Sequence, residues 1–507
     1  MDADTMNLNE DSYHDLENGR LLLPPRMVHF PGEEGWHLFF DPENHVWVRL
    51  NESGKEVMES LETHTRLEEV VQDLAERFDL NPVDIRDKVL VFIKGMVEAH
   101  MVHVDKYVFH KQSTTLAADH PIAVYFSNTE KCNLSCSYCY NADSRKRNGK
   151  SAREMTTEES IFALDRLRDF GVSIVAFCGG EPMFREDLFE VAAHAKQRGF
   201  FTALVTNGTL INDQNVNDVT RLFDFVWVSF DSIVKEEHEA FRGKGSYDRT
   251  LTAIKLLAKN RPKHFVVNSV VAKSNVRSMP ETHRILIDEI GVDIHRMSAY
   301  MPARTIEYDK EHKPIETIVT ERQYRDVMYN AGLRLELGGD ELPPLEVNSR
   351  DKLIIKKGIR RIQCGFASGD IHMVSNGDIY PCVMMFKDEF RAGNILEDDI
   401  VKIYRESEAM NKCREATVDK IKECDGCLVK YLCAGGCRAT AYEKYGSLTA
   451  YHKELCPVLR KSAIDSMWLD AKIPLDKMQA ASAEYERKLE EIDEMEKNKV
   501  KETSDVH

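Results

Sequence analysis

One short stretch decides the fold and the chemistry expected of this chain: Cys132-Asn133-Leu134-Ser135-Cys136-Ser137-Tyr138-Cys139-Tyr140. It holds three thiols, separated by three and then by two residues. Such a loop can place three thiolates around one [4Fe–4S] cluster and leave the fourth iron open for a substrate-like molecule. A structural zinc site is the alternative, but such a zinc takes four ligands and no fourth Cys or His adjoins the loop.

The cysteine loop follows the first of six apolar, strand-like runs that alternate with helical stretches. These runs cover residues 122–126, 174–177, 202–205, 225–230, 265–271 and 293–297. Apolar strands that alternate with helices predict a parallel sheet covered by crossover helices. We therefore expect the α/β class, with a partial (β/α)6 barrel of the TIM type between residues 115 and 305.

Short turn motifs follow the next three strands in a fixed order. They are Cys178-Gly179-Gly180-Glu181-Pro182, Thr206-Asn207-Gly208-Thr209, and Ser229-Phe230-Asp231-Ser232 with Arg242-Gly243 behind it. Each motif alone is more often a plain turn than a ligand site. Together with Cys-x3-Cys-x2-Cys, their order resembles the radical S-adenosylmethionine (SAM) superfamily. All of them fall at the carboxyl ends of strands, where parallel barrels keep their ligand sites.

The resemblance implies a [4Fe–4S] cluster on Cys132, Cys136 and Cys139 that cleaves bound SAM to methionine and a 5′-deoxyadenosyl radical. It also implies the residues that bind SAM: Gly179, Gly180, Glu181 and Pro182 for the amino group, Asn207 in the next turn, and Ser229 and Arg242 for the carboxylate. Glycines allow close backbone approach, and a carboxylate suits an ammonium group. Cys178 is interpreted as a small buried residue at a strand end.

Seven further cysteines follow in an ordered pattern: Cys364, Cys382, Cys424, Cys427, Cys433, Cys437 and Cys456. The pattern resembles the SPASM extension of radical SAM enzymes, which holds two auxiliary [4Fe–4S] clusters; one or two structural zinc sites are the alternative. The resemblance implies that Cys364, Cys382 and Cys437 bind the nearer cluster and the other four the farther one. Cys413 either completes the nearer cluster or is an ordinary buried thiol, and we favour an open iron that could bind a substrate thiolate.

The region from about residue 25 to 105 reads as a hairpin followed by three helices. Trp36, Leu38 and Phe40 alternate along one strand, a turn covers residues 41–44, and helices are expected from Asn51, over 67–78 and from Pro82. This order resembles the PqqD-like, winged-helix peptide-recognition domain. The resemblance implies that a leader peptide adds as a strand to an exposed sheet edge.

Composition limits the partners and the compartment. The 507 residues carry 68 basic and 85 acidic side chains, a net charge of −17, which opposes nucleic-acid binding even by a winged helix. The longest apolar runs are far shorter than the roughly 18 residues of a membrane span. The acidic start lacks the features of a secretory signal, so we expect the cytoplasm, and there the grouped cysteines favour metal over disulfides.

The expected domain organisation follows from these segments. It consists of a disordered leader (1–20), the peptide-recognition domain (21–110), the barrel (115–305), a connector (306–362), the SPASM domain (363–462) and a charged tail (463–507).

The three domains predict a maturase that binds the leader of a ribosomally made peptide and installs a thioether or carbon–carbon crosslink. A flavodoxin or ferredoxin is the expected electron donor. An anaerobic sulfatase-type maturase is one alternative, although that family has an aspartate where Val383 follows Cys382. Quinone or tetrapyrrole cofactor synthesis is a second alternative, and a noncatalytic iron–sulfur scaffold is a third.

Overall fold

The computed structural model describes most of the chain. The described residues are 16–31, 35–108, 119–139, 153–299, 354–357, 361–453, 455–457, 459–460, 463–464 and 467. The predicted leader up to residue 15, most of the predicted connector and most of the predicted tail lie outside this part. Leu16 is buried in the core of the N-terminal domain, so ordered structure begins within the segment expected to be a disordered leader.

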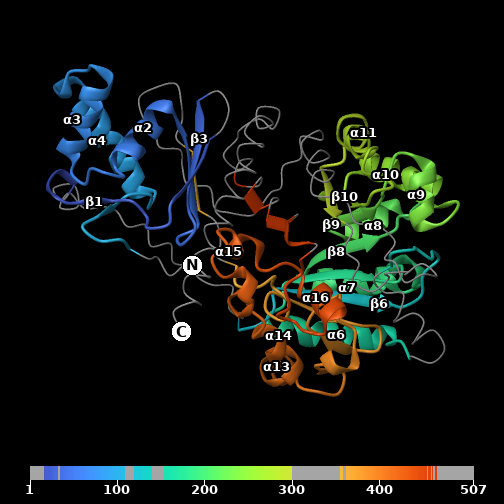
Figure 1. The fold of residues 1–507 in the computed structure, drawn as a ribbon. Helices are drawn as coiled ribbons and strands as arrows, with labels where there is room; N and C mark the ends of the chain where they lie inside the picture. Colours follow the sequence, from blue (N-terminus) through green and yellow to red (C-terminus); the bar gives the residue numbers. More distant parts are fainter. Residues whose placement is uncertain are drawn as a thin grey trace, which may run out of the picture.

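The centre of the molecule is a mostly parallel sheet (Figure 1). Its first six strands are β6 (Ala123–Thr129), β7 (Ile174–Gly179), β8 (Phe201–Thr206), β9 (Phe225–Ser229), β10 (His264–Val271) and β11 (Ile294–Ala299). They lie in the order β11-β10-β9-β8-β7-β6, and every neighbouring pair is parallel. All six strands expected from the sequence are therefore present, and the α/β class is confirmed.

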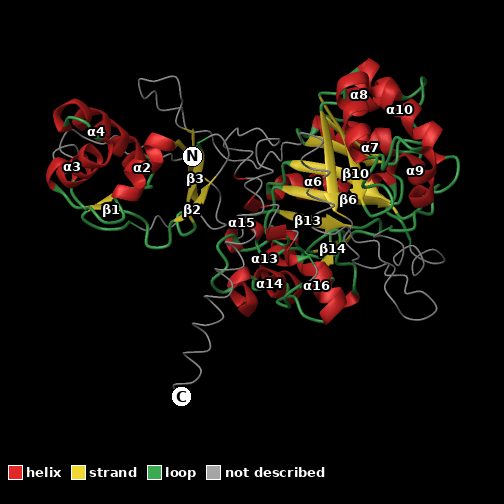
Figure 2. Ribbon diagram, turned by 45° about the horizontal axis from the view of Figure 1, so that its top comes forward, coloured by secondary structure: helices red, strands yellow, loops and turns green. Residues whose placement is uncertain are grey.

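Helices connect these strands and cover the outer face of the sheet (Figure 2). They are α6 (Thr157–Phe170), α7 (Leu188–Gln197), α8 (Val216–Leu222), α9 (Lys235–Arg242), α10 (Ser246–Asn260) and α11 (Met279–Arg284). The ends of α6 are encoded locally: Thr156 and Glu159 form a capping box, and Gly171 takes the left-handed conformation at the C-terminus. Val124 and Phe126 point to this helical face and are fully buried.

The cysteine-rich region continues the same sheet. Strand β13 (Asp370–Met373) pairs in parallel with β6, and β14 (Asp378–Tyr380) and β15 (Gly393–Asn394) follow as antiparallel strands. His372 Nε2 lies 2.7 Å from Ser127 Oγ of β6, which adds a side-chain hydrogen bond to this junction. The SPASM region and the barrel thus share one nine-stranded sheet, which the sequence alone did not indicate.

Several α-helices follow in the described part of the cysteine-rich region. They are α13 (Ile400–Glu406), α14 (Glu408–Arg414), α15 (Lys430–Cys433) and α16 (Arg438–Tyr445). Ser407 separates α13 from α14. The Ser407 hydroxyl accepts a hydrogen bond from the Met410 N–H at 3.3 Å and so caps the second helix.

The N-terminal domain has the predicted hairpin and three helices. Its sheet contains β2 (Val28–Pro31), β3 (Trp36–Asp41) and β4 (Val46–Asn51), followed by α2 (Glu52–Ser60), α3 (Leu67–Phe78) and α4 (Pro82–Glu98). A small pair, β1 (Leu21–Leu22) and β5 (His103–Val104), closes the domain. The helices bury one face of the sheet, with Val46, Val48 and Leu50 in that core.

The other face of this sheet packs on the cysteine-rich region. Phe30, Leu38, Phe40 and Trp47 form one apolar cluster with Leu428 and Val429 beside α15 and with Ala463, Ile464 and Met467 near the C-terminus. Arg26 adds a hydrogen bond from Nη2 to the Gly426 carbonyl at 3.0 Å. Both overall views place α15 between the N-terminal domain and the barrel (Figures 1 and 2).

One edge of the N-terminal sheet is occupied by the chain itself. Strand β12 (Ile354–Lys357), from the segment expected to be a connector, pairs antiparallel with residues Val46–Arg49 of β4. The sheet order is β12-β4-β3-β2.

No helix in the described part is long and apolar enough to cross a membrane.

Candidate metal centres and active site

The three cysteines of the first cluster lie in the loop that follows β6. The Leu134 N–H donates to Cys132 Sγ at 3.4 Å, and the Cys139 N–H donates to the Cys136 carbonyl at 3.3 Å. Burial raises the pKa of Cys136 to about 11, and the neighbouring thiols of Cys139 and Cys132 contribute to this increase. The three thiols are thus close to one another, and iron would displace their protons on binding.

The loop that carries the cysteines requires glycine at the last position of β7 and at the position after it. Gly179 has a φ of +118°, and a Cβ on Gly180 would lie 2.0 Å from the Lys131 carbonyl oxygen. The Gly180 and Glu181 N–H groups donate to the carbonyls of Thr129 and Lys131, each at 2.8 Å. The sequence attributed the glycines to close approach of a ligand. The structure adds a reason within the protein, because the loop that carries the cysteines packs directly on them.

Glu181 is almost fully buried and holds the ends of two strands together. Its carboxylate accepts hydrogen bonds from Thr206 Oγ1 at 2.7 Å, from the Asn207 N–H at 2.8 Å and from the Met183 N–H at 3.2 Å. Burial raises the pKa of this carboxyl group and these hydrogen bonds lower it. A carboxylate has about four acceptor positions, so about one is left for a ligand. Pro182 begins the short 3-10 helix Pro182–Phe184 that follows.

The turn after β8 is joined to the cysteine loop by amide contacts. Asn207 Nδ2 donates to Asn133 Oδ1 at 3.0 Å, and Asn133 Nδ2 donates to Thr209 Oγ1 at 2.8 Å. Asn133 lies between the first two cysteines of the motif. Asn207 therefore orients the loop that would hold the cluster.

Arg242, expected to approach the SAM carboxylate, forms a buried ion pair. Its Nε donates to Asp231 Oδ2 at 2.5 Å and its Nη2 to Asp231 Oδ1 at 3.3 Å. The Tyr138 hydroxyl donates to the same carboxylate, and the Arg242 guanidinium lies 5.6 Å from the Tyr138 ring centroid. Ser229, at the end of β9, is half-buried. Asp231 is a further candidate site residue that the sequence reasoning did not select, although a carboxylate directly after an apolar strand is a signal for one.

The auxiliary cysteines form two sets. Burial raises the pKa of Cys382, and the thiols of Cys364 and Cys437 raise it further. Burial likewise raises the pKa of Cys424 to about 12, with contributions from Cys427, Cys456 and Cys433. The sets are the same as those that the family resemblance implies; their ligation of iron stays a prediction.

The cysteine sets consist of thiols alone, the ligand type of a [4Fe–4S] cluster, in which each thiolate binds a different iron. Among the described residues, no three Cys, His, Asp or Glu side chains converge closely enough to hold one metal ion.

Two other cysteines lie in the packed interior. Cys178 is 2% exposed, and its Sγ lies 3.8 Å from Ser127 Oγ. Cys413, on α14, is fully buried among apolar side chains. Burial raises the pKa of Cys413 to about 12, and the Cys364 thiol adds to the increase, so Cys413 is near one member of the nearer set. The open iron expected for the nearer cluster stays a prediction.

The inner face of the sheet carries polar residues that no sequence motif marked. Because Val124 and Phe126 face the helices, Tyr125 between them faces the opposite side. Burial raises the pKa of Tyr125 to about 12, with a contribution from Asp370 at the start of β13. Burial also raises the pKa of Asp370 to about 6. These groups become neighbours only because β13 pairs with β6.

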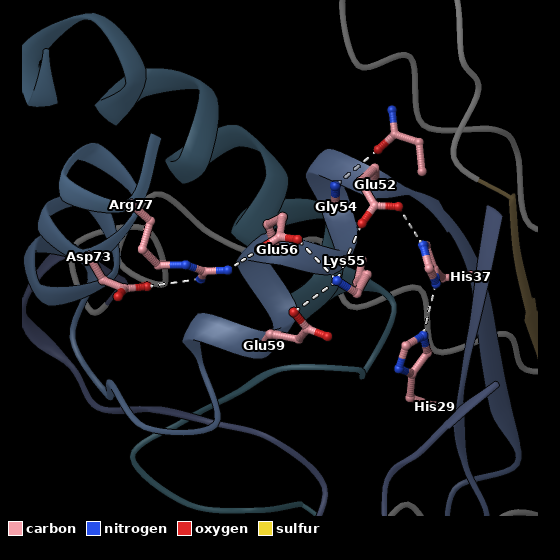
Figure 3. Close-up of polar contacts among 10 residues, drawn as sticks. His29, His37, Glu52, Gly54, Lys55, Glu56, Glu59, Asp73 and Arg77 are labelled. Carbon is pink, nitrogen blue, oxygen red and sulfur yellow. Dashed lines mark hydrogen bonds and ion pairs between the residues drawn. The ribbon is translucent and has the colours of Figure 1, made fainter. Parts of the chain in front are cut away.

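A chain of polar contacts links the edge strand of the N-terminal domain to its helices (Figure 3). His29 Nε2 lies 3.0 Å from His37 Nδ1, and His37 Nε2 lies 2.9 Å from the Glu52 carboxylate. The hydrogen bond from His37 lowers the pKa of Glu52. Lys55 continues the chain along α2, and Arg77 joins it to α3. Most of these groups are partly exposed, so this series of polar contacts orients the sheet on the helices and adds little stability.

Family models match three parts of the chain. Residues 127–285 match the radical SAM superfamily. The chain contains a radical SAM domain. Residues 37–102 match coenzyme PQQ synthesis protein D (PqqD), and residues 364–428 match the iron-sulfur cluster-binding domain SPASM. All three domains expected from the motifs are thus present in this chain, and they imply a SAM-binding [4Fe–4S] cluster and auxiliary clusters.

Several curated proteins are similar in sequence to this chain. The AdoMet-dependent heme synthase of Methanosarcina barkeri is 28% identical over 64% of this chain and 93% of its own length. The mycofactocin maturase MftC of Mycolicibacterium smegmatis is 27% identical over 64% of this chain and 80% of its own. The subtilosin biosynthesis protein AlbA of Bacillus subtilis is 23% identical over 83% and 90%, respectively.

Solved structures share the fold. Streptococcus suis SuiB bound to its precursor peptide SuiA has a TM-score of 0.51 at 15% identity, over 86% of this chain and 99% of SuiB. The native anSMEcpe structure with AdoMet and a peptide has a TM-score of 0.52 at 20% identity, over 72% of this chain and 99% of that one. These similarities show that the fold is shared.

Proposed function

We propose that this protein is a peptide maturase that binds the leader of a ribosomally made precursor and crosslinks its core region by radical chemistry. The observation that carries the proposal is a PqqD-like domain in the same chain as a radical SAM barrel and a SPASM domain. The apolar cluster of Phe30, Leu38, Phe40 and Trp47 with Leu428 and Val429 supports it, because it joins the peptide-recognition sheet to the auxiliary-cluster region.

Each site residue has a role in this proposal. Cys132, Cys136 and Cys139 hold the cluster that, with SAM, supplies a hydrogen-abstracting radical. The turn Gly179-Gly180-Glu181-Pro182 receives the SAM ammonium through backbone carbonyls and the acceptor position left on Glu181. Ser229 and Arg242 receive the SAM carboxylate, while Asp231 holds the guanidinium in place from the other side.

A thioether or carbon–carbon crosslink requires an electron acceptor. Closing the new bond from a substrate radical releases one electron and one proton. The seven cysteines of the SPASM region would hold the clusters that take the electron, with a flavodoxin or ferredoxin as donor for SAM cleavage. Asp370, half-buried beside Tyr125 on the inner face, is a carboxylate suited to take the proton.

A tetrapyrrole substrate is the second candidate, because the heme synthase is 28% identical. That match leaves about a third of this chain without a counterpart, whereas the match to AlbA extends over 83% of it. A sulfatase-type maturase ranks lower because Val383 follows Cys382. A noncatalytic scaffold ranks lowest, because it gives no reason for the intact cysteine loop and the turns bonded to it.

The test uses full-length protein, reconstituted without oxygen and mixed with SAM, dithionite and synthetic peptides encoded by short reading frames beside its gene. We expect one peptide to lose the mass of two hydrogens and 5′-deoxyadenosine to form, only when SAM is present. Cleavage of SAM with no change in any peptide, but with decarboxylation of an iron porphyrin, would reject the peptide function in favour of the tetrapyrrole one.

The edges of the N-terminal sheet restrict where a leader strand can bind. Strand β2 ends in Pro31, which has no N–H to donate, and proline on an edge strand discourages further pairing. In the described part of the chain, the four residues of β12 pair with Val46–Arg49 of β4. We therefore propose that the leader takes the place of this short strand on β4.

This exchange predicts that weakening β12 strengthens leader binding. In an Ile355→Pro/Lys356→Pro variant at least one ladder N–H is lost, because adjacent N–H groups point to opposite sides of a strand. A labelled leader peptide should bind this variant at least tenfold more tightly than the wild type, measured by fluorescence anisotropy without SAM. The Ile355→Ala/Lys356→Ala variant keeps both N–H groups and should bind like the wild type. Equal affinity for all three proteins would place the leader elsewhere.

A further inference from the structure

Arg438 is a buried cation beside the auxiliary cysteines. It is 1% exposed and begins α16 directly after Cys437. Its Nε donates to the Gly436 carbonyl at 3.3 Å, and its Nη1 donates to the carbonyls of Leu448 at 3.2 Å and Ala450 at 3.1 Å. Its Nη2 is buried and has no hydrogen-bond partner among the described residues.

The guanidinium lies beside the turn that connects the two cysteine sets. It packs against Gly435 and Gly436, the backbone that connects Cys433 of the farther set to Cys437 of the nearer one. A Cβ on Gly435 would lie 3.5 Å from Arg438 Cζ, and a Cβ on Gly436 would lie 3.8 Å from Nη2. Both glycines have positive φ, +73° and +77°, and the turn that they form joins the two sets next to this side chain.

The charge of Arg438 needs compensation that the described residues do not supply. Burial lowers the pKa of its guanidinium, whereas thiols of both sets, Cys364 and Cys437 of the nearer one and Cys424 and Cys433 of the farther one, raise it. Among the described residues it forms no ion pair with a carboxylate, and its hydrogen bonds go to carbonyl groups. An unpaired buried charge costs several kcal/mol, so a charge of opposite sign is expected close by. A [4Fe–4S] cluster with thiolate ligands carries that negative charge.

We propose that Arg438 sets the reduction potentials of both auxiliary clusters by holding one positive charge between them and offering Nη2 to their sulfur atoms. Reduction makes a cluster more negative, so a fixed cation nearby stabilises the reduced state and raises the potential. The inference rests on the auxiliary clusters of the proposed function. The charge of Arg438 would make these clusters better electron acceptors and favour electron transfer from one cluster to the other.

The test is a redox titration, followed by electron paramagnetic resonance, of full-length reconstituted protein without any peptide. All proteins carry Cys132→Ala, Cys136→Ala and Cys139→Ala, so that only the auxiliary clusters contribute to the signal. We expect Arg438→Met to lower both midpoint potentials by at least the 59 mV of a tenfold change in a one-electron equilibrium. Arg438→Lys keeps the charge and should lie between Arg438→Met and the parent protein. Arg405→Met, on the exposed face of α13, should leave both potentials unchanged.

The outcomes separate an electrostatic role from a structural one. Unchanged potentials in Arg438→Met, or a shift in one cluster alone, would overturn the proposal. Loss of iron from Arg438→Met but not from Arg438→Lys would support it, because the charge would then be needed to hold the clusters. Loss of iron from both would overturn it, since the hydrogen bonds to Leu448 and Ala450 would then be the essential feature. A failure to modify peptides would leave these potentials unaffected.

Discussion

Replacing Cys132, Cys136 and Cys139 together by alanine is expected to lower the iron of the reconstituted protein from about twelve to about eight per chain. The three thiols come from one loop, and the two auxiliary sets lie in the cysteine-rich region, so loss of the first cluster leaves the others intact. SAM cleavage should fall to background in the same variant. The measurement is a count of iron and sulfide per chain, with 5′-deoxyadenosine determined by chromatography.

Cys178→Ala is the matched control for this prediction. Cys178 lies just before the glycine turn but is fully buried in β7, so its removal should leave the iron at about twelve. About four irons in the wild type, with zinc making up the rest, would contradict the auxiliary clusters and remove the electron acceptor on which the crosslinking proposal depends. An unchanged iron count in the triple variant would contradict the assignment of the first loop.

The barrel and its loop were predictable from sequence because each element has a local signal. The six strands are apolar runs of the right length, and the cysteine motif fixes its own chemistry through spacing. Strands β12 and β13 have no such signal. Lys356 pairs with Trp47 and Ile371 with Val124, partners that are far away in the sequence, so only the folded chain brings them together. Strand β12 therefore occupies part of the sheet edge that was expected to be free for a leader peptide.

Sequence motifs identified several of the site residues, whereas the contacts of these residues depend on the folded structure. The thiols, the glycine pair and Glu181 were selected because their motifs are specific, but their contacts were not foreseeable. Glu181 uses most of its acceptor capacity on Thr206, Asn207 and Met183, and Gly180 is required by the Lys131 carbonyl. Asp231 and Arg438 were missed because a single charge beside a strand or a cysteine has many ordinary explanations until its burial is known.

Asp231→Asn is expected to destabilise the barrel by about 3–5 kcal/mol, because it leaves the Arg242 guanidinium buried without its counter-charge. The side chains are 0% and 8% exposed, so solvent does not screen the pair. Tyr138 also loses its charged acceptor, which should loosen the loop that carries the cysteines. Because the protein has several domains, hydrogen exchange is the suitable measurement, and the amides of β9 and β10 should exchange roughly a hundredfold faster or more.

Two variants show whether the buried charge is the cause. Asp218→Asn breaks an exposed ion pair with Arg221, whose side chains are 47% and 65% exposed, and should cost less than about 1 kcal/mol. Asp231→Asn/Arg242→Met removes both charges of the buried pair and should recover part of the stability, since an apolar replacement leaves no unpaired ion. If the double variant exchanges as fast as Asp231→Asn alone, the packing around Tyr138, and not the unpaired Arg242 charge, would account for the loss.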